Sequence, residues 1–243
     1  MTLIQRRGED EKMVLEKTFF ITQNMLGSLG DEVKPKGILD LFQTAAGLYE
    51  TEAGLSMQRL ISEGYCWVLE SIEYEQVLPL KQGETKVEVK AYRPVKAFYD
   101  MDFKMYDFCG RTAVKGSSRW LIIKADTRRI DLSGRFMYPV GVEKNEKFGE
   151  LKRIKDSFDG AEPSGTFTVR KSDTDIVGHL NNTVYADVIF EIFPFPLKKL
   201  HIDYVKETLF KETLSVFCKS DGARKLIVGK ADGEVRFKAE IEI

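Results

Sequence analysis

Cysteine, histidine and long apolar runs are all scarce in this 243-residue sequence, which has three cysteines and two histidines. An odd number of widely spaced cysteines without a CxxC pair excludes a disulfide framework. No run of about 18 apolar residues is present, so no membrane span is expected. The first 17 residues combine acidic side chains with only a short apolar stretch, which is not typical of a secretory signal or a transit peptide. We therefore expect a cytoplasmic protein.

Charge of one sign is also lacking. Lysine and arginine number 37 against 38 aspartates and glutamates, a net charge of −1, which argues against nucleic acid as the main partner. The motifs GxSxG, HExxH, Walker A and GxGxxG are absent, so neither a metal nor an organic cofactor is predicted. The three cysteines lie in or beside apolar runs, where a structural thiol is the usual role: Cys66, Cys109 and Cys218.

What is present is an apolar pattern that occurs twice. Each half shows a short strand, one helix and then a run of strands rich in β-branched and aromatic residues. In the first half the pattern predicts a strand at 17–22, a helix at 37–53 and strands beginning near 66, 85, 98 and 113. In the second half it predicts a strand from 165, a helix that ends before Pro194, and strands beginning near 197, 213, 225 and 234.

Short sequence matches support a duplication. Ile72-Glu73-Tyr74 and Leu80-Lys81-Gln82 resemble Ile202-Asp203-Tyr204 and Phe210-Lys211-Glu212, both at an offset of 130 residues. The pattern predicts an α+β fold in which one helix covers an antiparallel sheet, twice. We expect an N-terminal domain at 1–135, a charged, solvated linker at 136–162 and a C-terminal domain at 163–243.

One segment of the second half concentrates polar groups before a helix. Asp175 and His179 are four residues apart around Gly178, and Asn181 and Asn182 stand where helix caps occur. Backbone N–H groups from 178 to 182 are candidates to stabilise an oxyanion. A plain capped helix start is the structural alternative. His201, in an alternating run, is expected to be a solvent-facing strand residue.

The sequence resembles the acyl-[acyl-carrier-protein] thioesterases, which are built as two tandem hotdog domains. The resemblance spans nearly the whole chain. Three stretches carry it: Ser118-Arg119-Trp120 with Thr127-Arg128-Arg129; Asp173-Thr174-Asp175 with His179-Leu180-Asn181-Asn182 and Tyr185; and Ile202-Asp203-Tyr204-Val205-Lys206-Glu207-Thr208. It implies a double hotdog that hydrolyses fatty acyl thioesters on acyl carrier protein (ACP), releases free fatty acid and ends chain elongation.

The resemblance also implies roles for residues. Asp175, His179 and Glu207 would be catalytic, with Asn181 and Asn182 as tentative substrate contacts. The first half has no histidine, so the second half would carry the chemistry and the first would shape an acyl pocket. No metal or other cofactor is implied.

Two positions depart from the family pattern: Val177 stands where the plant enzymes have asparagine, and Thr208 where they have cysteine. A cysteine nucleophile is thus not available here. Asp175 would act either as general base or as nucleophile, and the sequence does not choose between them.

Alternatives remain at this stage. The same groups suit an acyl-CoA thioesterase, and a non-catalytic acyl-thioester-binding hotdog module is a rival of a different class. The basic pairs and runs at 128–129 and 152–155 are ordinary surface or a dock for an acidic partner. The expected partner is acyl-ACP, without nucleic acid or membrane. The chain is expected to be a monomer or a homodimer.

Overall fold

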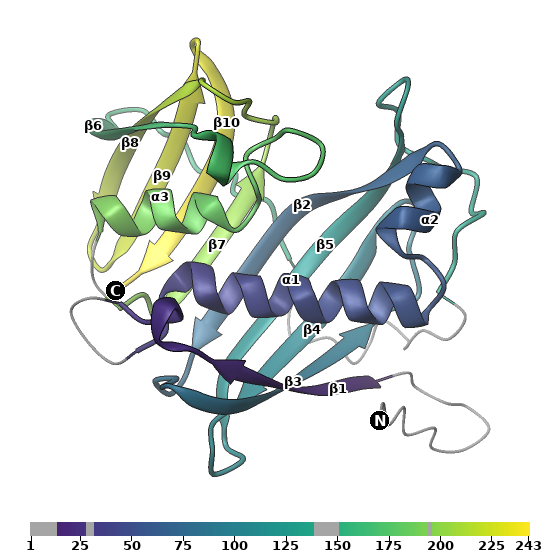
Figure 1. The fold of residues 1–243 in the computed structure, drawn as a ribbon. Coiled ribbons are helices and arrows are strands. Elements are labelled where there is room, and N and C mark those ends of the chain that lie inside the picture. Colours follow the sequence, from purple (N-terminus) through teal and green to yellow (C-terminus); the bar gives the residue numbers. More distant parts are fainter. Residues whose placement is uncertain (1–13, 28–31, 139–150, 194–195) are drawn as a thin grey trace.

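A computed structural model describes residues 14–27, 32–138, 151–193 and 196–243. Within these ranges the chain forms one ten-stranded antiparallel sheet with its two longer helices on the same side (Figure 1). The strands are β1 Val14–Ile21, β2 Tyr65–Gln76, β3 Gly83–Ala91, β4 Tyr99–Tyr106, β5 Thr112–Lys124, β6 Glu162–Thr168, β7 Lys199–Tyr204, β8 Thr213–Asp221, β9 Arg224–Ala231 and β10 Glu234–Glu242. The helices are α1 Pro35–Glu52, α2 Met57–Ser62 and α3 Val184–Ile192, with 3₁₀ turns η1 Gln23–Met25 and η3 Lys171–Asp173.

The order of strands in the sheet confirms the predicted duplication. It runs β1-β3-β4-β5-β2-β7-β10-β9-β8-β6, so the second half repeats the first in reverse order across the sheet. The halves meet where β2 pairs with β7, and there Ile72 lies opposite Ile202. These two residues are equivalent in the sequence repeat, so a pseudo-twofold axis passes between them. The two hotdog units therefore share one continuous sheet.

The helices pack against apolar side chains on one face of the sheet. Along β3, buried residues alternate with half-buried ones, as expected of a strand with one covered face. On α1, the buried Ile38, Phe42, Ala45 and Tyr49 recur at helical spacing and face the sheet. Phe42 stacks on Phe103 of β4 with ring centroids 4.5 Å apart. The close approach of α1 fixes the core of the first half.

Two details of the secondary structure differ from the sequence prediction. Helix α1 starts at Pro35, in the N1 position where a missing N–H costs nothing. The short helix α2 was not predicted, although its N-cap Ser56 accepts a hydrogen bond from the Arg59 N–H at 3.3 Å. None of the described helices is long and apolar enough to cross a membrane.

The connector between the halves is less solvated than its charge suggests. Most of 136–150 lies outside the described residues, but Leu151 and Ile154 are buried. The Ile154 N–H donates to the buried Asp203 carboxylate at 2.7 Å, and Arg153 pairs with Glu70 at 2.8 Å. The prediction of a solvated stretch is therefore wrong at the buried residues Phe136, Tyr138, Leu151 and Ile154, because apolar side chains within a charged run are still buried in the fold.

Candidate active site

The loop before α3 brings Asp175 and His179 together through a tight turn. One carboxylate oxygen of Asp175 accepts the N–H groups of Val177 at 2.9 Å and His179 at 3.1 Å. The Asp175 N–H in turn donates to the His179 carbonyl at 2.8 Å. Gly178 has a φ of +84°, a conformation that side chains with a Cβ rarely adopt. The turn thus depends on the Asp175 carboxylate and on Gly178.

This loop is anchored at its start by a second aspartate. Asp173 is buried, and its two oxygens accept hydrogen bonds at 2.9 Å from the Arg170 guanidinium. The Arg170 N–H donates to the same carboxylate, which closes a capping box around η3. Asp173 therefore has a structural role, and Asp175 is left as the carboxylate of the turn.

Backbone pairing brings the turn beside the segment that follows β7. The Leu180 N–H donates to the Thr208 carbonyl at 2.8 Å, and His179 forms an antiparallel bridge with Leu209. Glu207 therefore lies in the segment that pairs with the turn, two residues before the bridge partner of His179. The structure brings the three predicted catalytic residues into one region, with Asp175 and His179 half-buried and Glu207 exposed.

The charges around Glu207 keep it ionised. Its Oε1 lies 2.8 Å from Nη2 of Arg128, in the turn after β5 of the first half. Burial raises the pKa of the Glu207 carboxyl, but its own backbone N–H, Arg128, His179 and Lys206 together hold the pKa below its ordinary value. Glu207 is therefore a carboxylate at neutral pH. The sequence prediction treated Arg128 as surface or docking charge and missed this contact.

Asn181 and Asn182 lie at the start of α3. The Oδ1 of Asn181 accepts the N–H of Thr183 at 3.0 Å and so turns the chain just before the helix. The N-cap of α3 is Thr183, without a side-chain capping hydrogen bond, so the expectation that Asn181 or Asn182 caps the helix is wrong. The carbonyl of Asn182 accepts a hydrogen bond from the Tyr204 hydroxyl at 2.8 Å. Contact of either asparagine with substrate stays a prediction.

The expectation of oxyanion donors from 178 to 182 is wrong for four of the five backbone N–H groups. The N–H groups of 178 and 179 both donate to Asp175, that of 180 donates to Thr208, and that of 181 donates to Asp173. The Asn182 N–H is not among these donors. These N–H groups form hydrogen bonds that hold the loop together, so an oxyanion would need other donors.

Family models match both halves of this chain. The model described as acyl-ACP thioesterase N-terminal domain matches residues 13–132, and that described as acyl-ACP thioesterase C-terminal domain matches residues 158–242. The chain belongs to the acyl-ACP thioesterase family. It is accordingly a thioester hydrolase, and the family activity is hydrolysis of acyl-ACP.

Solved structures of acyl-ACP thioesterases share the fold of this chain. An acyl-ACP thioesterase from Bacteroides thetaiotaomicron is 22% identical with a TM-score of 0.84, over 94% of this chain and 97% of that one. A 12:0-ACP thioesterase from Umbellularia californica is 18% identical with a TM-score of 0.76, over 94% and 96%. No curated protein matches the sequence closely enough to report.

The two departures from the family pattern have different surroundings in this thioesterase. Thr208 is fully buried, and its hydroxyl lies 2.9 Å from that of Tyr185 on α3. Thr208 therefore ties the segment after β7 to α3 and is not available to substrate. Val177 is 50% exposed at the tip of the turn and brings no polar group. Neither departure therefore offers a nucleophile or a titratable group, and a catalytic role for Asp175, His179 and Glu207 stays a prediction.

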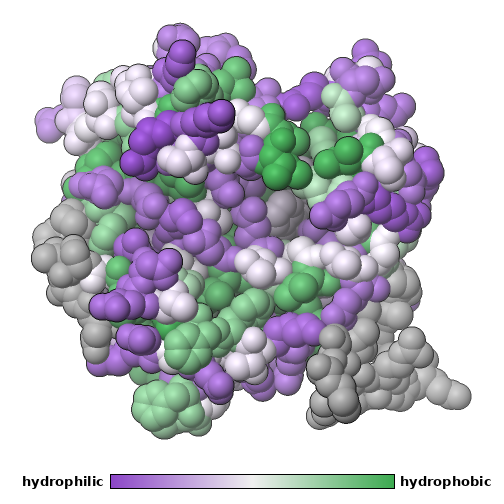
Figure 2. All heavy atoms as spheres, in the orientation of Figure 1, coloured by the Kyte–Doolittle hydropathy of each residue, from purple (hydrophilic) through white to green (hydrophobic). Residues whose placement is uncertain are grey.

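Apolar side chains are exposed around the site of this thioesterase. Figure 2 shows hydrophobic atoms where the loop before α3 faces the first half. The loops that carry the candidate residues expose large hydrophobic side chains at Ile130, Leu132, Ile176, Val177, Val205, Leu209 and Phe210. A gathering of exposed apolar groups marks a binding surface more often than isolated ones do, and it suits a substrate with a hydrocarbon chain.

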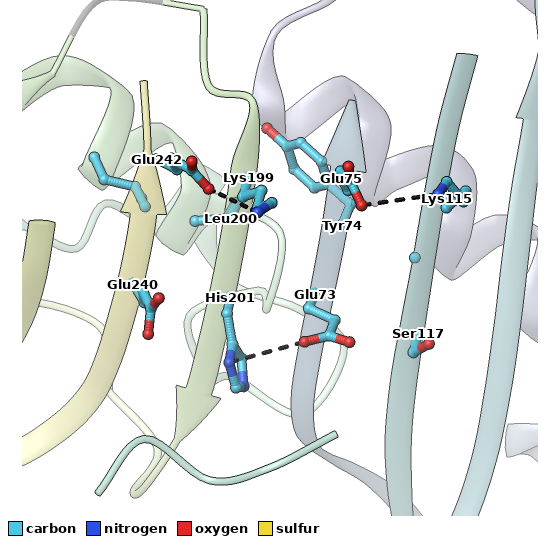
Figure 3. Close-up of a pocket in the computed structure, with 12 residues that line it drawn as sticks. Glu73, Tyr74, Glu75, Lys115, Ser117, Lys199, Leu200, His201, Glu240 and Glu242 are labelled. Carbon is cyan, nitrogen blue, oxygen red and sulfur yellow. Dashed lines mark ion pairs between the residues drawn. The ribbon is translucent and has the colours of Figure 1, made fainter. Parts of the chain in front are cut away.

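Two cavities in the described part of the chain lie away from Asp175, His179 and Glu207. One, of about 310 Å³, is on the outer face of the sheet where β2 meets β7 (Figure 3). There His201 Nδ1 lies 4.0 Å from Glu73 and His201 Nε2 lies 3.1 Å from Asp203. His201 is half-buried and paired, so the expectation of a solvent-facing residue is wrong, because the 151–158 segment covers this face.

The other cavity is a groove of about 1090 Å³ between η1 of the first half and α3 with β6 of the second. Asp175, His179 and Glu207 line neither cavity. Among the described residues, no group of three or more His, Cys, Asp or Glu side chains is arranged to hold a metal ion. An acyl pocket in the first half stays a prediction.

Proposed function

We propose that this thioesterase releases free fatty acid from acyl-ACP at a site formed by Asp175, His179 and Glu207. The observation that carries the proposal is the turn that ties Asp175 to His179, paired edge to edge with the segment that bears Glu207. Two carboxylate residues and a histidine lie on these two paired segments, which also expose apolar side chains. A pure acyl-binding module has no need of such a set beside a scissile bond.

The chemistry available to these residues is a carboxylate-led hydrolysis. As general base, Asp175 takes a proton from water while the water oxygen bonds to the thioester carbonyl carbon. As nucleophile, it attacks that carbon itself and forms an anhydride, which water then hydrolyses. In both versions the carbon–sulfur bond breaks, and the departing thiolate takes up a proton and becomes the free thiol of the carrier. Two N–H groups donate to one oxygen of Asp175, so in this proposal the other oxygen carries out the step.

His179 and Glu207 support this step. His179 orients the water or polarises the carbonyl, and Glu207 positions His179 or the water. The ionised state of Glu207 suits either role, since a carboxylate accepts hydrogen bonds from both. In this proposal residues 163–243 form the catalytic domain, residues 1–135 form the domain that takes the acyl chain, and 136–162 joins them. A cytoplasmic location, and a monomer or homodimer, stay predictions.

The test is steady-state hydrolysis of matched acyl-ACP and acyl-CoA substrates, from octanoyl to octadecanoyl, by wild type and Asp175→Asn. We expect turnover on the ACP series that disappears in Asp175→Asn, whose amide oxygen still accepts the two turn N–H groups. Faster turnover on the CoA series would transfer the assignment to an acyl-CoA thioesterase. Bound acyl groups without turnover, from folded wild type, would support the binding-module alternative.

A further inference from the structure

Arg128 stands at an unusual place in the backbone. It lies in the turn after β5, where its N–H donates to the Lys124 carbonyl at 2.9 Å. Its φ is +58°, in the left-handed region that favours glycine. Such strain in a residue other than glycine persists where the surrounding structure holds it, often at functional sites. Because this backbone conformation favours glycine, what an arginine adds at the position is its side chain.

That side chain reaches across the molecule to the candidate site. Nη2 of Arg128 lies 2.8 Å from Oε1 of Glu207, which is 79 residues away in the sequence. The other charged groups that act on Glu207 are His179, from the loop before α3, and Lys206, its neighbour on the chain. Lys206 is itself paired with Glu234 at 2.5 Å. Arg128 is thus the cation that contacts the Glu207 carboxylate directly.

We propose that Arg128 is a positioning residue of the active site, supplied by the N-terminal half, which holds the Glu207 carboxylate beside His179. This inference rests on the proposed function. It makes the first half a contributor to the chemistry of the second, so the site is incomplete without the turn after β5. An ion pair between side chains that are 47% and 39% exposed adds little to folding stability, so its main effect is on the site.

Arg128→Gly is the sharpest variant, because glycine fits a φ of +58° and the turn keeps its shape. We expect kcat to fall about 10- to 100-fold through loss of geometry at the reacting centre. Without Arg128 the pKa of Glu207 rises, so the acid limb of the pH profile of kcat moves to higher pH. The thermal midpoint of unfolding should not fall.

Controls separate this role from two others. Arg129→Gln, at the exposed next residue, should keep wild-type kcat. Arg128→Lys, or millimolar guanidinium added to Arg128→Gly, should restore part of the activity. The loss should appear equally with an acyl-N-acetylcysteamine thioester, which has no carrier protein. The double variant Arg128→Gly with Glu207→Gln should have a kcat only slightly lower than that of Glu207→Gln alone.

Three results would overturn the proposal. Full kcat in Arg128→Gly, with Glu207→Gln inactive, would remove Arg128 and leave the proposed function in place. A rise in KM for acyl-ACP alone, with normal turnover of the small thioester, would make Arg128 a carrier-docking residue instead. Full activity in Glu207→Gln would remove Glu207 from the proposed function, and the role of Arg128 with it.

Discussion

The two halves of this thioesterase build the same backbone frame before their helices and place different side chains on it. Both frames make the same three backbone hydrogen bonds, at nearly the same distances. In the first half the bonds are, in order, Gly27 N–H to Glu32 O at 3.0 Å, Lys34 N–H to Met25 O at 2.9 Å and Val33 N–H to Leu80 O at 3.0 Å. In the second half the corresponding bonds, in the same order, are Asp175 N–H to His179 O at 2.8 Å, Asn181 N–H to Asp173 O at 2.9 Å and Leu180 N–H to Thr208 O at 2.8 Å.

The frame is therefore a property of the hotdog unit, and the chemistry comes from the side chains placed on it. Where the second half has Asp175 and His179, the first has Gly27 and Glu32. The first half instead has the longer helix, 18 residues in α1 against 9 in α3. In the proposed function, the first unit covers more of the sheet and the second carries the chemistry.

Replacing Asp175 by glycine makes the catalytic frame resemble the first half. We expect Asp175→Gly to lower kcat on acyl-ACP by about 10²- to 10⁴-fold, the usual worth of a general base. It also removes the acceptor of two turn N–H groups, so the free energy of unfolding should fall by about 1 kcal/mol, as for a lost cap.

Asp175→Asn is the matched control, since it keeps that acceptor and should lose activity without the loss of stability. Denaturant unfolding beside the kinetics checks both expectations. An Asp175→Gly enzyme that retains a tenth of wild-type kcat would show that the two frames differ for another reason.

The core of the first half depends on one glycine beneath α1. A Cβ added to Gly116 of β5 would lie 2.3 Å from the Phe42 ring and 2.5 Å from the Glu73 carbonyl. Gly116→Ala should therefore lower the free energy of unfolding by about 1–3 kcal/mol. Gly47→Ala, in the interior of α1 with open space around it, should raise it by about 0.5–1 kcal/mol. Equal effects in urea titrations would contradict the close packing of α1.

A buried acid on α1 gives an expected effect on stability that depends on pH. Burial raises the pKa of Glu50 well above its ordinary value, and its Oε1 has no hydrogen-bond partner. A raised pKa favours folding below the unfolded-state pKa, and this contribution is lost as pH rises through the folded-state value. Glu50→Gln should thus equal wild type near pH 4 and exceed its stability by about 1–2 kcal/mol at pH 8. A difference that does not change with pH would place Glu50 in contact with water.

Periodicity and repeat predicted most of the fold. The offset between Ile72 and Ile202 predicted a duplication, and these residues face each other at the centre of the sheet. The match of Leu80 with Phe210 at the same offset is wrong, because backbone hydrogen bonding makes Leu80 equivalent to Thr208. Strand order was not predictable in detail, because the pairing of β2 with β7 joins distant parts of the chain. Helix α2 had a signal that was not used: Ser56 as N-cap, with Gly54 and Gly64 on either side.

The site was predictable only in part. Asp175, His179 and Glu207 were found through family resemblance, and the turn that joins the first two follows from their spacing around Gly178. The contact of Arg128 with Glu207 has no local signal, since it depends on how two distant loops pack. The sequence equally hides which N–H groups the loop uses for itself, because hydrogen bonds such as that from Leu180 to Thr208 are tertiary.

If only the second frame carries the chemistry, equivalent substitutions in the two frames should differ sharply in their effect on activity. His179→Gln and Glu32→Gln change equivalent positions of the two frames, and kcat/KM on acyl-ACP is measured for both. We expect kcat/KM to fall about 100-fold or more in His179→Gln and to stay within about twofold of wild type in Glu32→Gln. Comparable losses in both variants, or an active His179→Gln enzyme, would contradict this expectation.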